Sequence, residues 1–220
     1  MACTITVKGI GHLTAKVDHV ILQMKLETLN KDYERAVQDA AERIEKLHAA
    51  LKGAGFAKEA VKTTRFHVET RYENVQDRQG RYKRVFAGYA CCHDLKLSFD
   101  FDKKELARAL SAIASSGAEA ELQIEFTAKD PAKVSEELLT RAAQNAREKA
   151  EVLCRASGCR LGALLAIDYN WGELDIVSRT EYTPGDLAQF RMLQVAGSVP
   201  EIEPDDIDVT DTVAFRWEIL

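Results

Sequence analysis

Aromatic residues, prolines and long apolar runs are all scarce in this chain of 220 residues. Only 7% of the residues are aromatic, and 4 are proline. No run approaches the roughly 18 apolar residues of a membrane-spanning helix, so the sequence predicts no membrane span. The 46% hydrophobic and 30% charged residues are nevertheless typical of globular proteins, which excludes wholesale disorder.

The beginning of the chain has no basic n-region and no apolar h-region, and so lacks the features of a secretory signal peptide. We therefore expect a cytoplasmic protein, or an exported one only if a leader has been removed. The cysteine count agrees, because an odd number without a signal indicates reduced thiols. The five cysteines are Cys3, Cys91, Cys92, Cys154 and Cys159.

Catalytic and metal-binding motifs are absent from the sequence. Gly9 and Gly11 have no third glycine and no following helix, so they do not form a dinucleotide loop. No histidine lies in an H-x-x-x-H or H-E-x-x-H arrangement, and there is no nucleophile elbow or phosphate-binding loop. We therefore predict no catalytic residues, no cofactor and no metal, and expect a protein that is not an enzyme.

The charge is unevenly distributed. The net charge of −5 argues against bulk binding of nucleic acid or of an anionic membrane. Residues 181–220 hold nine acids and two bases, a charge of −7, so residues 1–180 carry +2. The acidity therefore belongs to the C-terminal end.

Apolar residues alternate at the beginning of the chain, as they do in strands. One set runs from Ile5 to Val17, and a second set in the opposite phase runs from Val20 to Leu26. We interpret the change of phase at Val17–His19 as the turn of a β-hairpin. Gly9 and Gly11 mark places where another element packs closely on the first strand.

Three segments have helical spacing and recognisable ends. The first covers Tyr33–Leu51, with Asn30 as its N-cap. Asp102 and Glu105 resemble a capping box at the beginning of the second, and Asp130–Pro131 begins the third. An alanine-rich face of the third helix permits close approach to a sheet or another helix. The predicted inward positions include Leu138, Ala142, Ala146, Ala150 and Leu153.

Strands and helices follow in the order ββαββαβαββ, which predicts an α+β fold. We expect two linked α/β-sandwich subdomains, with antiparallel or mixed sheets and helices packed on one face. Residues 1–94 plus 207–220 form the first predicted subdomain, 95–177 form the second, and 178–206 form a long loop excursion. The apolar spacing of the last strand breaks near Asp211, which predicts a bulge.

Four segments, in the right order along nearly the whole chain, resemble the SIMPL-domain family. They are ITVKGIG at residues 5–11 with Asp18 and Leu26–Thr28; Val61–Thr64 with Tyr72 and Gly88–Tyr89; Asn145–Glu151 with Gly158, Leu161 and Gly162; and Ile202–Pro204 with Val209. Val17 stands where the family usually has proline.

The resemblance implies a two-part α+β fold and no established reaction or catalytic residues. Many members of the family are exported envelope proteins linked to stress tolerance, some resemble ring-forming homo-oligomers, and the animal member is a kinase-associated signalling adaptor. The missing signal peptide sets this chain apart from the exported members.

A hairpin at residues 65–89 combines basic and aromatic residues, with six bases and three acids. It is either an ordinary hairpin with charges outward, a surface for single-stranded nucleic acid, or a partner for the acidic C-terminal segment of another subunit. We favour subunit contact over nucleic acid because both charged segments are already in the chain. The candidate interaction residues are Arg78, Arg81, Tyr82, Lys83 and Arg84.

Cys154 and Cys159 lie five residues apart across a predicted helix end and form a candidate redox pair. The alternative is that both are small buried hydrophobic residues. The predicted function is that of a non-enzymatic SIMPL-like protein with a stress-related role, which binds a second copy or another protein. Single-stranded nucleic-acid binding and thiol-based stress sensing are the alternatives.

Overall fold

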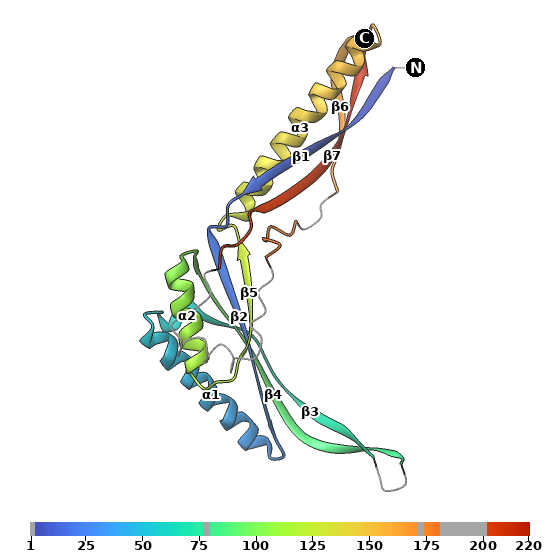
Figure 1. Ribbon diagram of the computed structural model, residues 1–220. Coiled ribbons are helices and arrows are strands. Elements are labelled where there is room, and N and C mark those ends of the chain that lie inside the picture. The colour runs from blue at the N-terminus through green and yellow to red at the C-terminus, as the bar shows by residue number, and fades with distance from the viewer. Residues whose placement is uncertain (1–2, 77–79, 171–173, 181–201) are drawn as a thin grey trace. The chain divides into compact units, whose positions relative to one another are not determined.

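The computed structural model describes residues 3–76, 80–170, 174–180 and 202–220. Its helices and strands follow the predicted order and form an α+β fold with two antiparallel sheets (Figure 1). No helix among these residues is long and apolar enough to cross a membrane. The strands are β1 (Thr4–Ala15), β2 (His19–Asn30), β3 (Val61–Gln76), β4 (Tyr82–Asp100), β5 (Glu121–Thr127), β6 (Leu161–Asp168) and β7 (Ile207–Ile219). The helices are α1 (Tyr33–Gly53), η1 (Lys58–Ala60), α2 (Lys103–Ser115) and α3 (Pro131–Ala156).

The chain divides into two compact units. The first consists of Met1–Asp18, Phe126–Thr180 and Pro204–Leu220, and its sheet has the strand order β1-β7-β6. The second consists of His19–Glu125 and Glu181–Glu203, and its sheet has the order β3-β4-β2-β5. These units differ from the predicted subdomains 1–94 plus 207–220 and 95–177. The difference arises because β1 and β2 belong to different sheets.

The predicted hairpin between β1 and β2 is therefore wrong. Strand β1 pairs with β7 along its whole length, from Thr4↔Glu218 to Ala15↔Ile207, whereas β2 pairs with β4. The change of phase at Val17–His19 is the point where the chain passes from one sheet to the other. Asp18 fixes this point, because its carboxylate accepts a hydrogen bond of 2.6 Å from the backbone N–H of Lys129.

Helix α3 packs directly on β1 in the first unit (Figure 1). A Cβ atom on Gly9 would lie 1.9 Å from the carbonyl oxygen of Ala142, and one on Gly11 would lie 2.0 Å from that of Leu138. The expected close packing at the two glycines is therefore confirmed. On the helix side, the contact is made by fully buried residues: Leu138, Ala142, Ala146 and Ala150. The prediction that Leu153 also faces inward is wrong, because the neighbouring Cys154 takes the buried position and Leu153 is exposed.

Helices α1 and α2 cover one face of the four-stranded sheet in the second unit (Figure 1). Alternate residues of β2 are buried, as the period of a strand with one covered face requires. These residues are Val20, Leu22, Met24, Leu26 and Thr28. The intervening residues, including Glu27, belong to the opposite face of the sheet.

The predicted helix beginnings hold for two helices of the three. Asp102 accepts a hydrogen bond from the N–H of Glu105, and Asp130 accepts one from Lys133. The cap of α1 is Asp32 rather than Asn30, and its carboxylate accepts from the N–H of Arg35. The side chain of Asn30 instead accepts a hydrogen bond from the backbone N–H of Asp32, the N-cap residue itself.

Strand β7 contains no bulge at Asp211, since its pairing with β1 is uninterrupted. Asp211 occupies an inward position, and its carboxylate accepts a hydrogen bond of 2.9 Å from the hydroxyl of Tyr169. A polar residue in an apolar series produced the false signal. Most of the predicted loop excursion, residues 181–201, lies outside the described residues.

Candidate functional site

Strands β3 and β4 extend beyond the rest of their sheet as a two-stranded ribbon (Figure 1). Asn30, the last residue of β2, pairs with Tyr89, whereas β3 and β4 continue to pair as far as Gln76↔Tyr82. We call residues 70–76 and 82–88 the outer ribbon. This confirms the hairpin predicted at residues 65–89. An isolated two-stranded ribbon is marginally stable in water, so its side chains decide whether it needs a partner.

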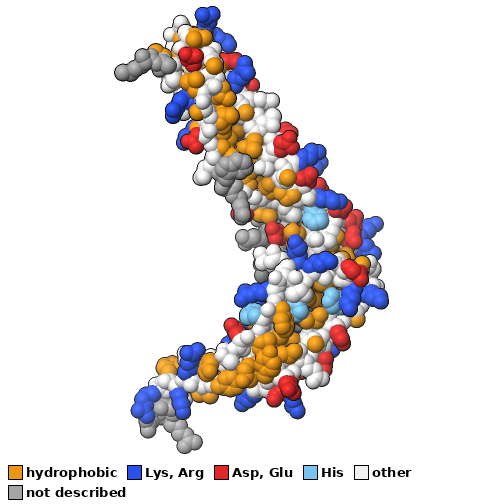
Figure 2. All heavy atoms as spheres, turned by 180° about the vertical axis from the view of Figure 1, so that it is seen from behind, with side chains coloured by type: hydrophobic (Ala, Val, Ile, Leu, Met, Phe, Trp, Pro, Cys, Tyr) orange, Lys and Arg blue, Asp and Glu red, His pale blue; other side chains and the backbone are white. Residues whose placement is uncertain are grey.

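The outer ribbon exposes apolar side chains on both faces. Residues directly opposite each other share a face, so Tyr72 and Phe86 lie on one face and Val85 lies on the other. Tyr82, at the beginning of β4, is 74% exposed. Figure 2 shows hydrophobic side chains gathered along this arm. The exposed large apolar residues of the ribbon are Tyr72, Val75, Tyr82, Val85 and Phe86.

A row of aromatic contacts holds the base of the ribbon in place. Phe86 makes edge-to-face contacts with Tyr72 and with Tyr89, at centroid distances of 5.8 and 5.3 Å. Tyr89 in turn contacts Tyr33, the first residue of α1, at 5.5 Å. The guanidinium of Arg84 lies 4.5 Å from the centre of the Tyr72 ring, which is a cation–π distance.

The predicted interaction residues divide between described and undescribed positions. Arg81, Tyr82, Lys83 and Arg84 lie at the outer end of the hairpin, and Arg78 lies outside the described residues. Arg71, another base of the hairpin, is engaged within the chain. Its Nη2 is 3.0 Å from Glu27 Oε1 and 3.1 Å from Glu69 Oε1, and Glu27 raises the pKa of Arg71.

Several carboxylates of the acidic C-terminal segment also have partners in their own chain. Glu203 forms an ion pair with Lys103. Asp208 accepts a hydrogen bond of 2.6 Å from the hydroxyl of Thr14, and the bond from Tyr169 to Asp211 raises the pKa of that tyrosine. The exposed acids Asp205 and Asp206, just before β7, remain candidates for an external basic partner.

Strand β6 is a second exposed apolar element. It lies at an edge of its sheet, where β7 is its one partner among the strands of the described residues. Leu164, Leu165 and Ile167 are exposed. The register with β7 shifts between Leu164 and Ala166, so Leu164, opposite Trp217, and Ile167, opposite Phe215, lie on the same face. Edge strands of this kind are open to pairing with another chain.

The two predicted redox cysteines are brought together at the end of α3. The thiol of Cys159 donates a hydrogen bond of 3.3 Å to the carbonyl oxygen of Cys154. Burial, together with the neighbouring Cys159 thiol, raises the pKa of Cys154. A raised pKa lowers the thiolate fraction at neutral pH and makes Cys154 a weak nucleophile.

Three metal-ligating side chains meet on the four-stranded sheet. His67, Glu69 and Cys92 each offer a ligand atom, and these atoms lie within 4.8 Å of one another. His67 is directly opposite Cys92 in the register of β3 and β4, and Glu69 follows two residues later on the same face. Within the described residues, this is a group whose ligand atoms are close enough to hold a metal ion.

The family model named SIMPL, described as a protein of unknown function (DUF541), matches residues 5–217. This chain belongs to the SIMPL family. The match confirms the resemblance carried by the four sequence segments. No curated protein matches the SIMPL chain.

Solved structures offer only distant likenesses to the SIMPL chain. The regulatory subunit of aspartate kinase from Thermus flavus is 12% identical, with a TM-score of 0.19 over 97% of this chain and 89% of that one. A hydrolase from Listeria innocua is 10% identical, with a TM-score of 0.21 over 96% and 92%. At these TM-scores the likenesses carry no inference about fold or function.

Sequence reasoning missed the group of His67, Glu69 and Cys92 in the SIMPL chain. The available signal was weak: His67 and Glu69 alternate on one strand, and Cys92 lies 25 residues further along. Only the register of β3 and β4, which includes a shift between Thr63 and Arg65, places Cys92 opposite His67. The spacing of residues within one strand does not reveal how that strand is aligned with its neighbour.

Proposed function

We propose that this SIMPL protein acts without catalysis, through self-association in which the outer ribbon of one copy packs on a second copy. The observation that supports the proposal is the pair of apolar faces on the ribbon. Tyr72, Tyr82 and Phe86 are exposed on one face, and Val75 and Val85 on the other. Burying such side chains takes their apolar surface out of water. Each Å² buried contributes about 25 cal/mol to the free energy of association.

Charge favours a second copy as the partner. The hairpin at residues 65–89 carries +3, so the remainder of the chain, which sums with it to −5, carries −8. Complementary charge steers association and suppresses wrong orientations. Lys83 and Arg84 on the ribbon would therefore meet acidic surface on the neighbouring copy, for which Asp205 and Asp206 are candidates.

Light scattering at increasing protein concentration tests the proposal. We expect the wild-type mass to rise above the monomer mass of 24.5 kDa. The double variant Tyr82→Ser, Phe86→Ser should remain monomeric. The matched control is Val152→Ser, Leu153→Ser, which removes two exposed apolar side chains from α3 and should assemble like the wild type.

Charge reversal and added salt provide a second test of self-association. The double variant Lys83→Glu, Arg84→Glu should raise the concentration needed for assembly, and added salt should weaken wild-type assembly because it screens exposed charges. A wild-type protein that stays at 24.5 kDa under all conditions contradicts the proposal. So does a control variant that dissociates as fully as the ribbon variant.

Single-stranded nucleic-acid binding is the second candidate function of the same ribbon. Tyr82 is its most exposed aromatic residue, and Lys83 and Arg84 follow it in the sequence. Single strands bind proteins by stacking their nucleobases on aromatic rings, while nearby Lys and Arg side chains attract the phosphate backbone. A labelled single strand titrated at low salt distinguishes the two functions. Binding that disappears in Lys83→Glu, Arg84→Glu, by a protein that stays monomeric, would favour nucleic acid over assembly.

A further inference from the structure

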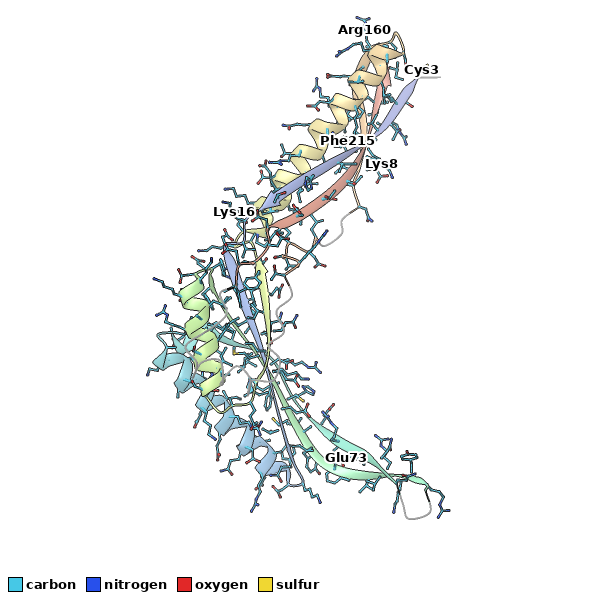
Figure 3. All side chains as sticks on the ribbon, viewed as in Figure 1. Cys3, Lys8, Lys16, Glu73, Arg160 and Phe215 are labelled. Carbon is cyan, nitrogen blue, oxygen red and sulfur yellow. The ribbon has the colours of Figure 1, made fainter. Side chains whose placement is uncertain are left out.

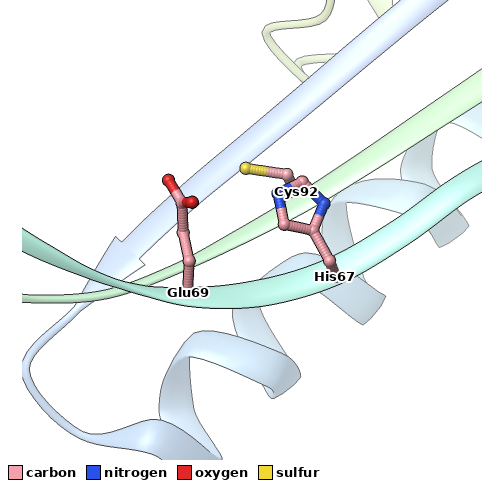
Figure 4. A group of neighbouring side chains, drawn as sticks. All are labelled: His67, Glu69 and Cys92. Carbon is pink, nitrogen blue, oxygen red and sulfur yellow. The ribbon is translucent and has the colours of Figure 1, made fainter.

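The face of the four-stranded sheet opposite α1 and α2 holds a compact group of polar side chains. In Figure 4 the ring of His67, the carboxylate of Glu69 and the thiol of Cys92 turn toward one another. A fourth side chain, Glu27, joins them from β2, where it is directly opposite Cys92. The thiol of Cys92 donates to Glu27 Oε2 over 3.7 Å.

We propose that His67, Glu69, Cys92 and Glu27 form a binding site for a single zinc ion. A thiolate sulfur, an imidazole nitrogen and carboxylate oxygens are the ligands that zinc prefers in proteins. Four such ligands complete the tetrahedral shell of a structural zinc site. None of the four ligands belongs to the outer ribbon, so the site does not rest on the proposed self-association.

The spacing of the ligand atoms is close to what zinc requires. Ligand atoms in a tetrahedral zinc site lie about 3.3–3.8 Å apart, given metal–ligand distances of about 2.0–2.3 Å. The three atoms of His67, Glu69 and Cys92 are already within 4.8 Å of one another. Side-chain rotation can close the difference, because Glu69 is exposed and its ion pair with Arg71 at the surface is only a weak restraint. Cys92, by contrast, is buried and fixes the inner position.

The charges around the group are balanced for a divalent cation. Zinc with one thiolate and two carboxylates has a net charge of −1, and Arg71 supplies the compensating positive charge. Arg71 already contacts both Glu27 and Glu69, so it holds these carboxylates beside Cys92. Arg65 Nη2 lies 3.4 Å from His67 Nε2, and this weak contact is one that a zinc ion could displace.

Cobalt and zinc titrations of the full chain test the site. Cobalt is a spectroscopic substitute for zinc, and a thiolate ligand gives it a charge-transfer band in the near ultraviolet. With a non-chelating reductant present, we expect this band to saturate at one cobalt per chain. Zinc should then remove the band and raise the melting temperature, because it binds only the folded site.

Matched variants separate the site from adventitious binding. Cys92→Ser should abolish the cobalt–thiolate band, and Glu69→Gln should weaken zinc binding by about tenfold or more. Cys91→Ser, whose thiol lies on the opposite face of β4, and Glu73→Gln, further out on β3 (Figure 3), should behave like the wild type. The exposed Glu69→Gln keeps the test valid if Cys92→Ser fails to fold.

Two outcomes overturn the proposal. One is a cobalt spectrum without a thiolate band. The other is zinc affinity that is the same in the wild type, Cys92→Ser and Glu69→Gln. In either case the group is an internal ion-pair and hydrogen-bond network around Arg71. Neither outcome affects the assembly test, which uses residues of the ribbon.

Discussion

In the unit that contains β2–β5, the fold lowers the pKa of two histidines. Burial and the nearby Lys58 lower the pKa of His48 in α1. Burial also lowers the pKa of His93 in β4, with a further contribution from His48, although Asp94 acts in the opposite direction. The Nδ1 atoms of both rings are enclosed without a hydrogen-bond partner among the described residues.

We predict that the free energy of unfolding falls as the pH drops below the ordinary histidine pKa of about 6.5. The unfolded chain takes up these protons more readily than the folded chain, so acid favours unfolding. Urea denaturation at about pH 7.5 and about pH 5.5 measures the effect. His48→Gln should lose less stability than the wild type over this interval. An equal loss in both proteins would assign the effect to other groups.

The cysteines should differ in reactivity according to exposure. Cys3 is exposed, whereas Cys154 is buried and its pKa is raised. We therefore expect Cys154 to be alkylated much more slowly than Cys3 in the folded protein, since the thiolate is the reactive form. Mass spectrometry of samples quenched over time provides the rates. Rapid formation of a Cys154–Cys159 disulfide in dilute peroxide would instead support the thiol-sensor alternative.

At the scale of elements, the contact between β1 and α3 depends on two missing side chains. We predict that Gly9→Ala lowers the free energy of unfolding by about 1–3 kcal/mol or more, because its Cβ would overlap the backbone of α3. Gly53→Ala is the matched control, because a Cβ there meets nothing within 4 Å. It should be neutral or slightly stabilising at the end of α1. Urea denaturation that shows Gly9→Ala to be as stable as the wild type would contradict the packing.

The sequence predicted the structure best where the residues that determine an element lie within that element. The Asp102 and Asp130 caps, the alternation within β1 and the alanine face of α3 are local patterns, and each corresponds to an observed element. The change of phase at Val17–His19 was also real, but a turn and a passage between sheets produce the same pattern. Only the pairing of β1 with β7, about 200 residues apart, distinguishes them.

The candidate sites also combine features that one segment reveals with features that depend on strand pairing. The basic and aromatic composition of the hairpin was visible in the sequence, but the exposure of Tyr82 and the engagement of Arg71 depend on where β2 ends. Likewise, Cys92 is one of two adjacent cysteines whose side chains point to opposite faces of β4. The sequence cannot tell which of the two faces His67, because that choice depends on the register with β3.

At the scale of the whole molecule, the two ends of the chain lie side by side in one sheet. Thr4 of β1 pairs with Glu218 of β7, and β7 is the central strand between β1 and β6 (Figure 1). The sheet of the other unit, in contrast, consists of strands that all end by Thr127. One sheet therefore forms only when strands about 200 residues apart are both present, whereas the other forms from residues 19–127.

This arrangement has a consequence for the order of events during synthesis. Chains begin to fold from the N-terminal end while translation continues. Strand β1 is made before β2–β5 but has to wait for β7, its partner about 200 residues later, whereas β2–β5 have all their partners once β5 is complete. The backbone N–H and C=O groups of β1 are thus without their native hydrogen-bond partners until β7 has been made. During that interval β1 is an unpaired strand, which other nascent chains can pair with.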